Sequence, residues 1–185
     1  HGDEGEPIGI ITSSRDITDR YLLERQLKLS ERRFRGLFEN SPVSLFELDL
    51  SELKTHLDEL RGSGDAELER YFAKDPDALE RCFELIKVIN VNSAARDLFM
   101  LDEHGRPREE TQGYLQQGLD TFREGLVAFA HGARTFSAET TMGIAGNRTI
   151  TISLRISLAP GAEGNWSRAI ASVEDITGFK ELERD

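Results

Sequence analysis

The clearest hydrophobic pattern lies near the N-terminus, where apolar residues alternate spacings of four and three. The positions that follow this spacing are Leu23, Leu27, Ser30, Phe34 and Leu37. Such a spacing is typical of the seam of a coiled-coil helix, so we predict a helix over residues 19–38 that pairs with a second copy through the four apolar positions. The seam is short and contains a serine, and the pattern therefore also fits one amphipathic helix packed on its own domain.

Beyond Pro42 the pattern changes several times between strands and helices. The predicted strands are Val43–Leu50, Lys87–Val91, Phe136–Met142, Thr149–Leu158 and Ser167–Val173. Predicted helices form an insert at about 51–85, a short segment capped by Asn92 or Ser93, and a longer segment over Tyr114–Ala130. This order predicts an α+β domain with a five-stranded antiparallel sheet and helices over one face.

A sequence repeat frames the chain. Residues 13–25 recur at 172–184, and each copy consists of a predicted strand, the tripeptide Asp-Ile-Thr and a predicted helix. The two copies of the tripeptide are Asp16, Ile17, Thr18 and Asp175, Ile176, Thr177. Short oxygen-bearing side chains at these places suit the first turn of a helix, because they accept its unpaired amide hydrogens.

The repeat suggests how the chain is organised. We expect residues 1–18 to be the last strand and exit motif of an upstream domain. Residues 19–38 would be a connecting helix, 39–177 one complete domain, and 178–185 the start of an outgoing helix.

Composition and charge narrow the function classes. The chain of 185 residues is 38% hydrophobic and 31% charged, as expected of an ordinary folded domain. Its net charge of −11 opposes general binding of nucleic acids. The apolar runs are short and the N-terminus does not resemble a secretory signal, so we expect no membrane contact by this segment and a cytoplasmic location.

Candidate catalytic residues do not emerge from the pattern. The four histidines are scattered along the sequence without ligand-like spacing, and the single cysteine, Cys82, rules out an internal disulfide. The glycines at 143 and 146 fall in a predicted turn between strands and do not open a helix, so they do not indicate a phosphate-binding loop. We therefore expect neither catalysis nor a metal site in this segment.

Three motifs resemble those of the PAS family: Ser30–Pro42, Val91–Ala95 and Glu174–Thr177. The resemblance implies the PAS fold, with Asp16, Ile17 and Thr18 as the exit motif of a preceding PAS domain. The insert, with Asp49-Leu50-Ser51 and Leu68-Glu69-Arg70-Tyr71, is similar to a PAS subfamily found in sensor kinases and cyclic-dinucleotide enzymes. It implies a module that regulates a downstream histidine kinase or diguanylate cyclase.

The resemblance also raises the question of a ligand. Some PAS domains bind haem through a histidine on the long helix, but His131 lies at the end of the predicted helix, and we expect it to contact the terminal carbonyls there. The sequence around Cys82 does not match the flavin-binding motif, so we expect this residue to fill the core. We predict no cofactor, although a small-molecule cavity remains an alternative to a filled core. The residues expected to line it are Phe46, Ile89, Leu98, Phe122, Leu126, Met142, Ile152 and Leu154.

Two functions remain open at this point. One is a ligand-sensing PAS module that modulates an output domain through dimeric helices. The other is a PAS dimerisation spacer that senses nothing and has a filled core.

Overall fold

The computed structural model describes residues 18–61, 65–75, 77–102, 118–144 and 148–183. The chain divides into two compact units, one ending at Gly36 and the other starting at Leu37. The described residues of the first unit all belong to the exposed helix α1 (Thr18–Glu39). The last three residues of α1 belong to the second unit. The predicted strand and motif residues before Thr18 lie outside the described residues.

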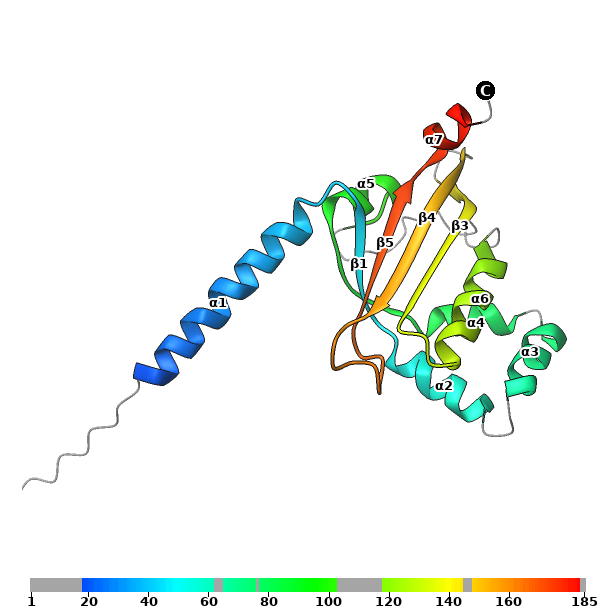
Figure 1. Ribbon diagram of the computed structural model, residues 1–185, viewed down its shortest axis with the longest axis horizontal. Coiled ribbons are helices and arrows are strands. Elements are labelled where there is room, and N and C mark those ends of the chain that lie inside the picture. The colour runs from blue at the N-terminus through cyan, green and yellow to red at the C-terminus, as the bar shows by residue number, and fades with distance from the viewer. Residues whose placement is uncertain (1–17, 62–64, 76, 103–117, 145–147, 184–185) are drawn as a thin grey trace, which may run out of the picture. The chain divides into compact units, whose positions relative to one another are not determined.

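The second unit contains a five-stranded antiparallel sheet, as predicted. Its strands are β1 (Ser44–Asp49), β2 (Lys87–Val91), β3 (Thr135–Ile144), β4 (Arg148–Leu158) and β5 (Ala169–Asp175). Their order across the sheet is β2-β1-β5-β4-β3, so the first and last strands of the unit lie side by side near its centre (Figure 1).

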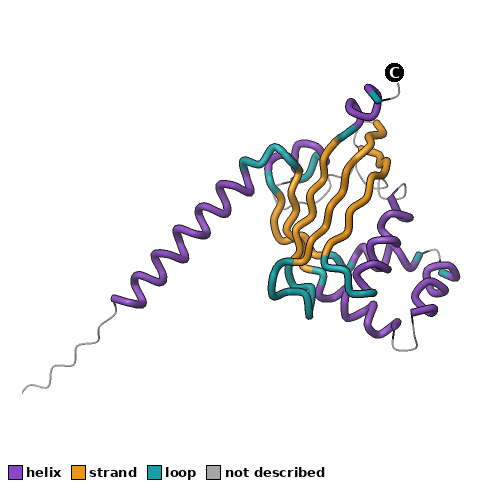
Figure 2. Tube along the Cα trace, in the orientation of Figure 1, coloured by secondary structure: helices purple, strands orange, loops and turns teal. Residues whose placement is uncertain are grey.

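Helices lie in the connections from β1 to β2 and from β2 to β3, and one more follows β5 (Figure 2). They are α2 (Ser51–Arg61), α3 (Asp65–Lys74), α4 (Ala78–Glu84), α5 (Ser93–Phe99), α6 (Leu119–Ala130) and α7 (Thr177–Leu182). The first three form the predicted insert after the first strand. The predicted long helix over Tyr114–Ala130 is described from Leu119 onward, and its first residues lie outside the described part.

The core lies between the helices and one face of the sheet. On β4, Ile150 and Ile152 are buried while Thr149 and Arg155 on the opposite face are exposed, which follows from the period of two in an extended strand. Phe46 on β1 packs against all three buried clusters of the described core. The α+β class and the helices over one face are thus confirmed.

Candidate functional site

The incoming and outgoing helices attach at the same end of two neighbouring strands. Strand β1 follows the end of α1, and β5 leads into α7. Because β1 and β5 are antiparallel, the start of one lies beside the end of the other, and Ser44 pairs with Val173. Each helix is tied to the sheet by its own set of hydrogen bonds.

The first set centres on the buried side chain of Asn92. Its Oδ1 accepts hydrogen bonds from the amides of Leu45 (2.9 Å) and Ala95 (3.0 Å). Its Nδ2 donates to the carbonyls of Val43 (2.8 Å) and Phe38 (3.1 Å). Asn92 thus caps α5 and holds the end of α1 and the start of β1 with one amide group.

Two neighbours on α5 strengthen this attachment. The Ser93 hydroxyl donates to the carbonyl of Glu39 at 2.8 Å. Arg96 forms an ion pair with the Glu39 carboxylate and donates to the carbonyl of Val91 at 2.6 Å. We call Asn92, Ser93 and Arg96, with the backbone of residues 38–45, the N-terminal anchor.

The second set joins β5 to α7 through the predicted exit motif. The Asp175 carboxylate accepts from the amide of Thr177 at 2.9 Å. The Thr177 hydroxyl accepts from the amide of Thr151 at 2.9 Å, and the amide of Ile176 donates to the carbonyl of Thr151 at 2.8 Å. The start of α7 is therefore bonded to β4 as well as to its own strand.

One further contact extends this set to β3. Lys180 on α7 pairs with Glu139 at 2.9 Å, and the hydrogen bond that the ammonium group donates to the Glu139 carboxylate raises the pKa of Lys180. We call Asp175, Ile176, Thr177 and Lys180, with Thr151 and Glu139, the C-terminal anchor. These bonds connect α7 directly to β3 and β4.

The residues predicted to line a cavity divide into two groups. Leu126 is buried in the cluster that includes the insert, with Phe122 packed against it. Ile152 is buried in a second cluster, with partly buried partners Leu98, Met142 and Leu154. Phe46 contacts both groups. The structure thus brings seven of the eight positions to the helical face of the sheet, and whether they enclose a ligand stays a prediction.

Ile89 is the exception, and its placement in the core is wrong. Its side chain is 53% exposed. Strand β2 is at the edge of the sheet, and the register between β1 and β2 shifts so that Leu48 pairs with Val88 and Glu47 with Asn90. Ile89 is the extra residue of this bulge, which interrupts the alternation that the sequence pattern assumed.

The predicted seam residues are on α1 and exposed. The exposed fractions are 66% for Leu23, 69% for Leu27, 42% for Phe34 and 69% for Leu37. Thr18 is the first residue of α1, just as Thr177 is the first residue of α7, so both copies of the repeat begin a helix. Asp16 and Ile17 lie outside the described residues.

The residues weighed for cofactors lie apart from one another. His131 is the exposed C-cap of α6, whereas Cys82 on α4 is buried in the main core cluster. Burial raises the pKa of the Cys82 thiol to about 11. In the described part of the chain, no three His, Cys, Asp or Glu side chains come close enough together to hold a metal ion. None of the described helices has the length and apolar character needed to cross a membrane.

Sequence reasoning missed two central residues. It named Asn92 or Ser93 as a helix cap but did not predict the bonds of Asn92 to residues 38–45, although the family-like motifs on either side of the contact were a usable signal. It did not single out Trp166, which the structure buries against α2 and α6. No local pattern indicates the latter, because the contacts come from distant segments.

Comparisons with known proteins bear on the fold. No protein-family model matches the chain, and no curated protein matches it. A PAS domain from Colwellia psychrerythraea aligns over 82% of this chain and 98% of its own, with a TM-score of 0.50 and 10% identity. A PAS domain of an HTR-like protein from Haloarcula marismortui aligns over 85% and 100%, with a TM-score of 0.49 and 17% identity.

A third similar structure is a domain of a sensory box sensor histidine kinase/response regulator from Geobacter sulfurreducens. It aligns over 80% of this chain and 96% of its own, with a TM-score of 0.47 and 15% identity. Together with the strand order and helix placement, the Colwellia structure establishes the class: the unit that begins at Leu37 has the fold of a PAS domain.

Proposed function

We propose that this chain is a PAS signal-relay module of a larger cytoplasmic signalling protein. The observation that carries the proposal is the position of the two anchors at the same end of neighbouring strands. Because the anchors lie at the same end of the sheet, a rearrangement in the PAS core would affect both α1 and α7. The bonds involved are few and specific, as a relay with two discrete arrangements requires.

The path to α1 runs through α5. Phe99 on α5 packs edge-on against Phe46 with ring centroids 5.6 Å apart, and Asn92 caps the same helix. A ligand or strain that displaces Phe46 therefore moves α5, and with it the side chain that holds the end of α1. The path to α7 runs through β4, whose backbone at Thr151 bonds to Thr177 and Ile176.

The output of the relay is proposed to be a histidine kinase or a diguanylate cyclase in the same parent protein. The support is the similarity of the insert to a PAS subfamily found in sensor kinases and cyclic-dinucleotide enzymes. This segment supplies no catalytic step of its own in the proposal. Neighbouring PAS and output domains of the parent are its partners in the chain, with residues 1–18 as the end of an upstream PAS domain.

We further propose that two copies associate through α1. Its exposed leucines follow the heptad spacing, and removing such apolar surface from water is the main driving force for coiled-coil association. A parallel pair would bring two output domains together. The lack of an apolar residue at Ser30 predicts a weak isolated contact, on the order of micromolar.

The second candidate function is a dimerisation spacer whose core binds nothing. It is favoured by the observation that six of the predicted cavity residues belong to packed hydrophobic clusters together with Phe46. Native mass spectrometry of the purified chain separates the two: a copurified small molecule supports sensing, and a mass equal to the polypeptide alone supports the spacer.

The relay itself is tested by loosening one anchor and observing the other. Ser93→Ala removes a hydroxyl from the N-terminal anchor, and the matched control Ser137→Ala removes one from the exposed face of β3. We expect Ser93→Ala to accelerate amide hydrogen exchange at Ile176 and Thr177 by about threefold or more, with the control unchanged. Equal exchange in both variants and the parent sequence would refute the relay.

A further inference from the structure

Trp166 adopts an unusual backbone conformation for a large residue. It is the only tryptophan in the chain, is buried, and has φ of 54°. This left-handed region brings Cβ close to the following carbonyl, so residues other than glycine rarely occupy it. Such a conformation persists where the surrounding structure enforces it.

The Trp166 amide donates to the carbonyl of Ala162 in its own loop at 2.7 Å, and the side chain is held by two helices. The indole packs on the Phe129 ring of α6, with centroids 5.6 Å apart, and the Lys54 ammonium of α2 lies 5.5 Å from the indole centroid. The Trp166 carbonyl accepts from the amide of Leu50, immediately before α2, at 2.9 Å. Both the side chain and the backbone of Trp166 thus hold the first turn of the insert.

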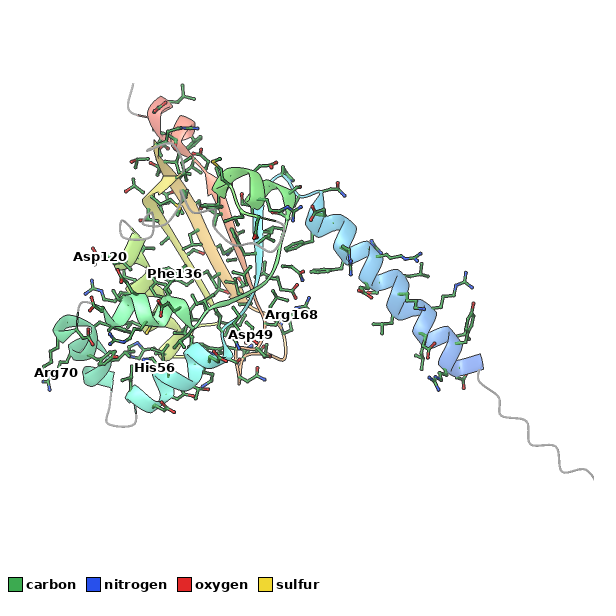
Figure 3. The ribbon with its side chains drawn as sticks, turned by 180° about the vertical axis from the view of Figure 1, so that it is seen from behind. Asp49, His56, Arg70, Asp120, Phe136 and Arg168 are labelled. Carbon is green, nitrogen blue, oxygen red and sulfur yellow. The ribbon has the colours of Figure 1, made fainter. Side chains whose placement is uncertain are left out.

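Trp166 also lies three residues before β5. Ala169 and Ala171 of β5 are buried in the same cluster as Trp166 and the insert residue Leu53. In Figure 3, Asp49 and Arg168 mark this end of β1 and β5, away from α7. Strand β5 is hydrogen-bonded to β1 on one side and to β4 on the other. A shift of its first residues would therefore move the strand along its own axis and displace the C-terminal anchor at its other end.

We propose that Trp166 couples the helical insert to β5, which makes the insert a second input to the module. In this proposal the contacts with α2 and α6, together with the hydrogen bond from the Trp166 amide to the Ala162 carbonyl, hold residue 166 in the left-handed conformation. A shift of α2 away from α6 releases it, changes the path of the chain into β5 and loosens the C-terminal anchor. This inference rests on the proposed relay, because it assumes that loosening the C-terminal anchor changes the signal passed to α7.

The experiment uses the whole chain and substitutes the cation above the indole. Lys54→Met keeps most of the side-chain length and removes the charge, and Lys74→Met makes the same change at the exposed end of α3. Each of the two lysine substitutions is made in the parent sequence and in a Trp166→Gly background. Glycine accepts a positive φ without strain but has no aromatic ring, so this background removes the indole contacts and keeps the backbone conformation accessible. Amide exchange at Ile176 and Thr177 is measured in all of them. Trp166→Phe replaces Trp166→Gly if the glycine variant does not fold cooperatively.

The expected result has three parts. In the parent sequence Lys54→Met shifts tryptophan emission to the red and accelerates exchange at the two amides by about threefold, while Lys74→Met does neither. In the Trp166→Gly background Lys54→Met has no further effect, and with Trp166→Phe its effect is reduced. The coupling would be overturned if Lys54→Met in the parent sequence caused no emission shift or no faster amide exchange. It would also be overturned if Lys54→Met accelerated exchange equally in the parent sequence and in the Trp166→Gly background. The relay fails separately, through the Ser93→Ala test at the other anchor.

Discussion

Ser44 and Val173 face each other across the β1–β5 ladder, and both are buried. Ser44 follows the segment held by Asn92, and Val173 lies two residues before Asp175, whose carboxylate accepts a hydrogen bond from the amide of Thr177 at the start of α7. The two helices therefore join neighbouring strands at the same end of the sheet, and α7 is also bonded to β4 and β3. The predictions below test the anchors, the core and the exposed helix in turn.

The N-terminal anchor should depend strongly on Asn92. Asn92→Ala leaves the carbonyl of Val43 and the amides of Leu45 and Ala95 without their buried partner. We expect the free energy of unfolding to fall by about 3 kcal/mol, since each buried unsatisfied group costs about 1–3 kcal/mol. Denaturant unfolding measures this.

A matched control comes from Asn165, an exposed asparagine whose side chain accepts one hydrogen bond from the amide of Ser167. Asn165→Ala should cost less than about 1 kcal/mol. If both variants lose the same stability, the bonds of Asn92 contribute no more than those of an exposed turn.

The C-terminal anchor should give a local effect. Thr177→Val keeps the shape of the side chain but removes the acceptor for the Thr151 amide. We expect a loss of about 1 kcal/mol in global stability together with about tenfold faster exchange at the Thr151 amide. Asp175→Ala should likewise cost about 1 kcal/mol, because it removes the hydrogen bond from the Thr177 amide.

Thr149→Val is the control for this position, because Thr149 is exposed on the same strand. It should leave exchange at Thr151 unchanged. An unaltered Thr151 amide in Thr177→Val would show that the hydroxyl does not hold α7 to β4.

The sequence predicted the elements well because each has a local cause. The alternation along residues 149–158 predicts a strand with one buried face and one solvent-exposed face. Thr177 begins a helix where the exit motif predicted one. The same local reasoning failed at Ile89, where a bulge at the sheet edge turns an apolar residue toward solvent. A bulge depends on the partner strand, which periodicity in one strand does not report.

The candidate site was predicted only in part for a similar reason. The exit motif was identified because both its capping residues and its repeat are visible in sequence. The hydrogen bonds of the Asn92 side chain join segments about fifty residues apart, and the Trp166 ring packs against α2 and α6. A residue whose role depends on long-range contacts is hard to identify from the local pattern of hydrophobic and polar residues.

The stability of the core should respond to pH through Cys82. Burial raises the pKa of its thiol to about 11, whereas an unfolded thiol has a pKa of about 8.5. The folded state keeps the proton at a pH where the unfolded chain loses it. The contribution of this thiol to stability is therefore complete below about pH 8.5 and is lost as pH rises toward 11.

Comparison with Cys82→Ala isolates this contribution from other groups that titrate at high pH. We expect the free energy of unfolding of the parent sequence to fall more steeply than that of the variant between about pH 8.5 and 11. Parallel curves for the two proteins would mean that the thiol is not shielded from water in the folded state.

The exposed helix α1 should be the contact between two copies of the chain. Leu27 and Leu29 are both exposed leucines on α1, but only Leu27 is in the seam. Leu27→Lys puts a charge where the partner helix must approach, so we expect this variant to be monomeric at about 100 μM by light scattering. Leu29→Lys adds the same charge outside the seam and should leave the dimer intact.

Ser30→Leu provides the complementary gain, because it completes the apolar seam between Leu27 and Phe34. Burying one more leucine per chain should tighten the dimer by about tenfold or more, since each 1.4 kcal/mol corresponds to a factor of ten. A chain that begins after Phe38 lacks the whole seam and should remain monomeric. Dimerisation of that shorter chain, or equal loss of the dimer in Leu27→Lys and Leu29→Lys, would place the contact between copies somewhere other than this seam.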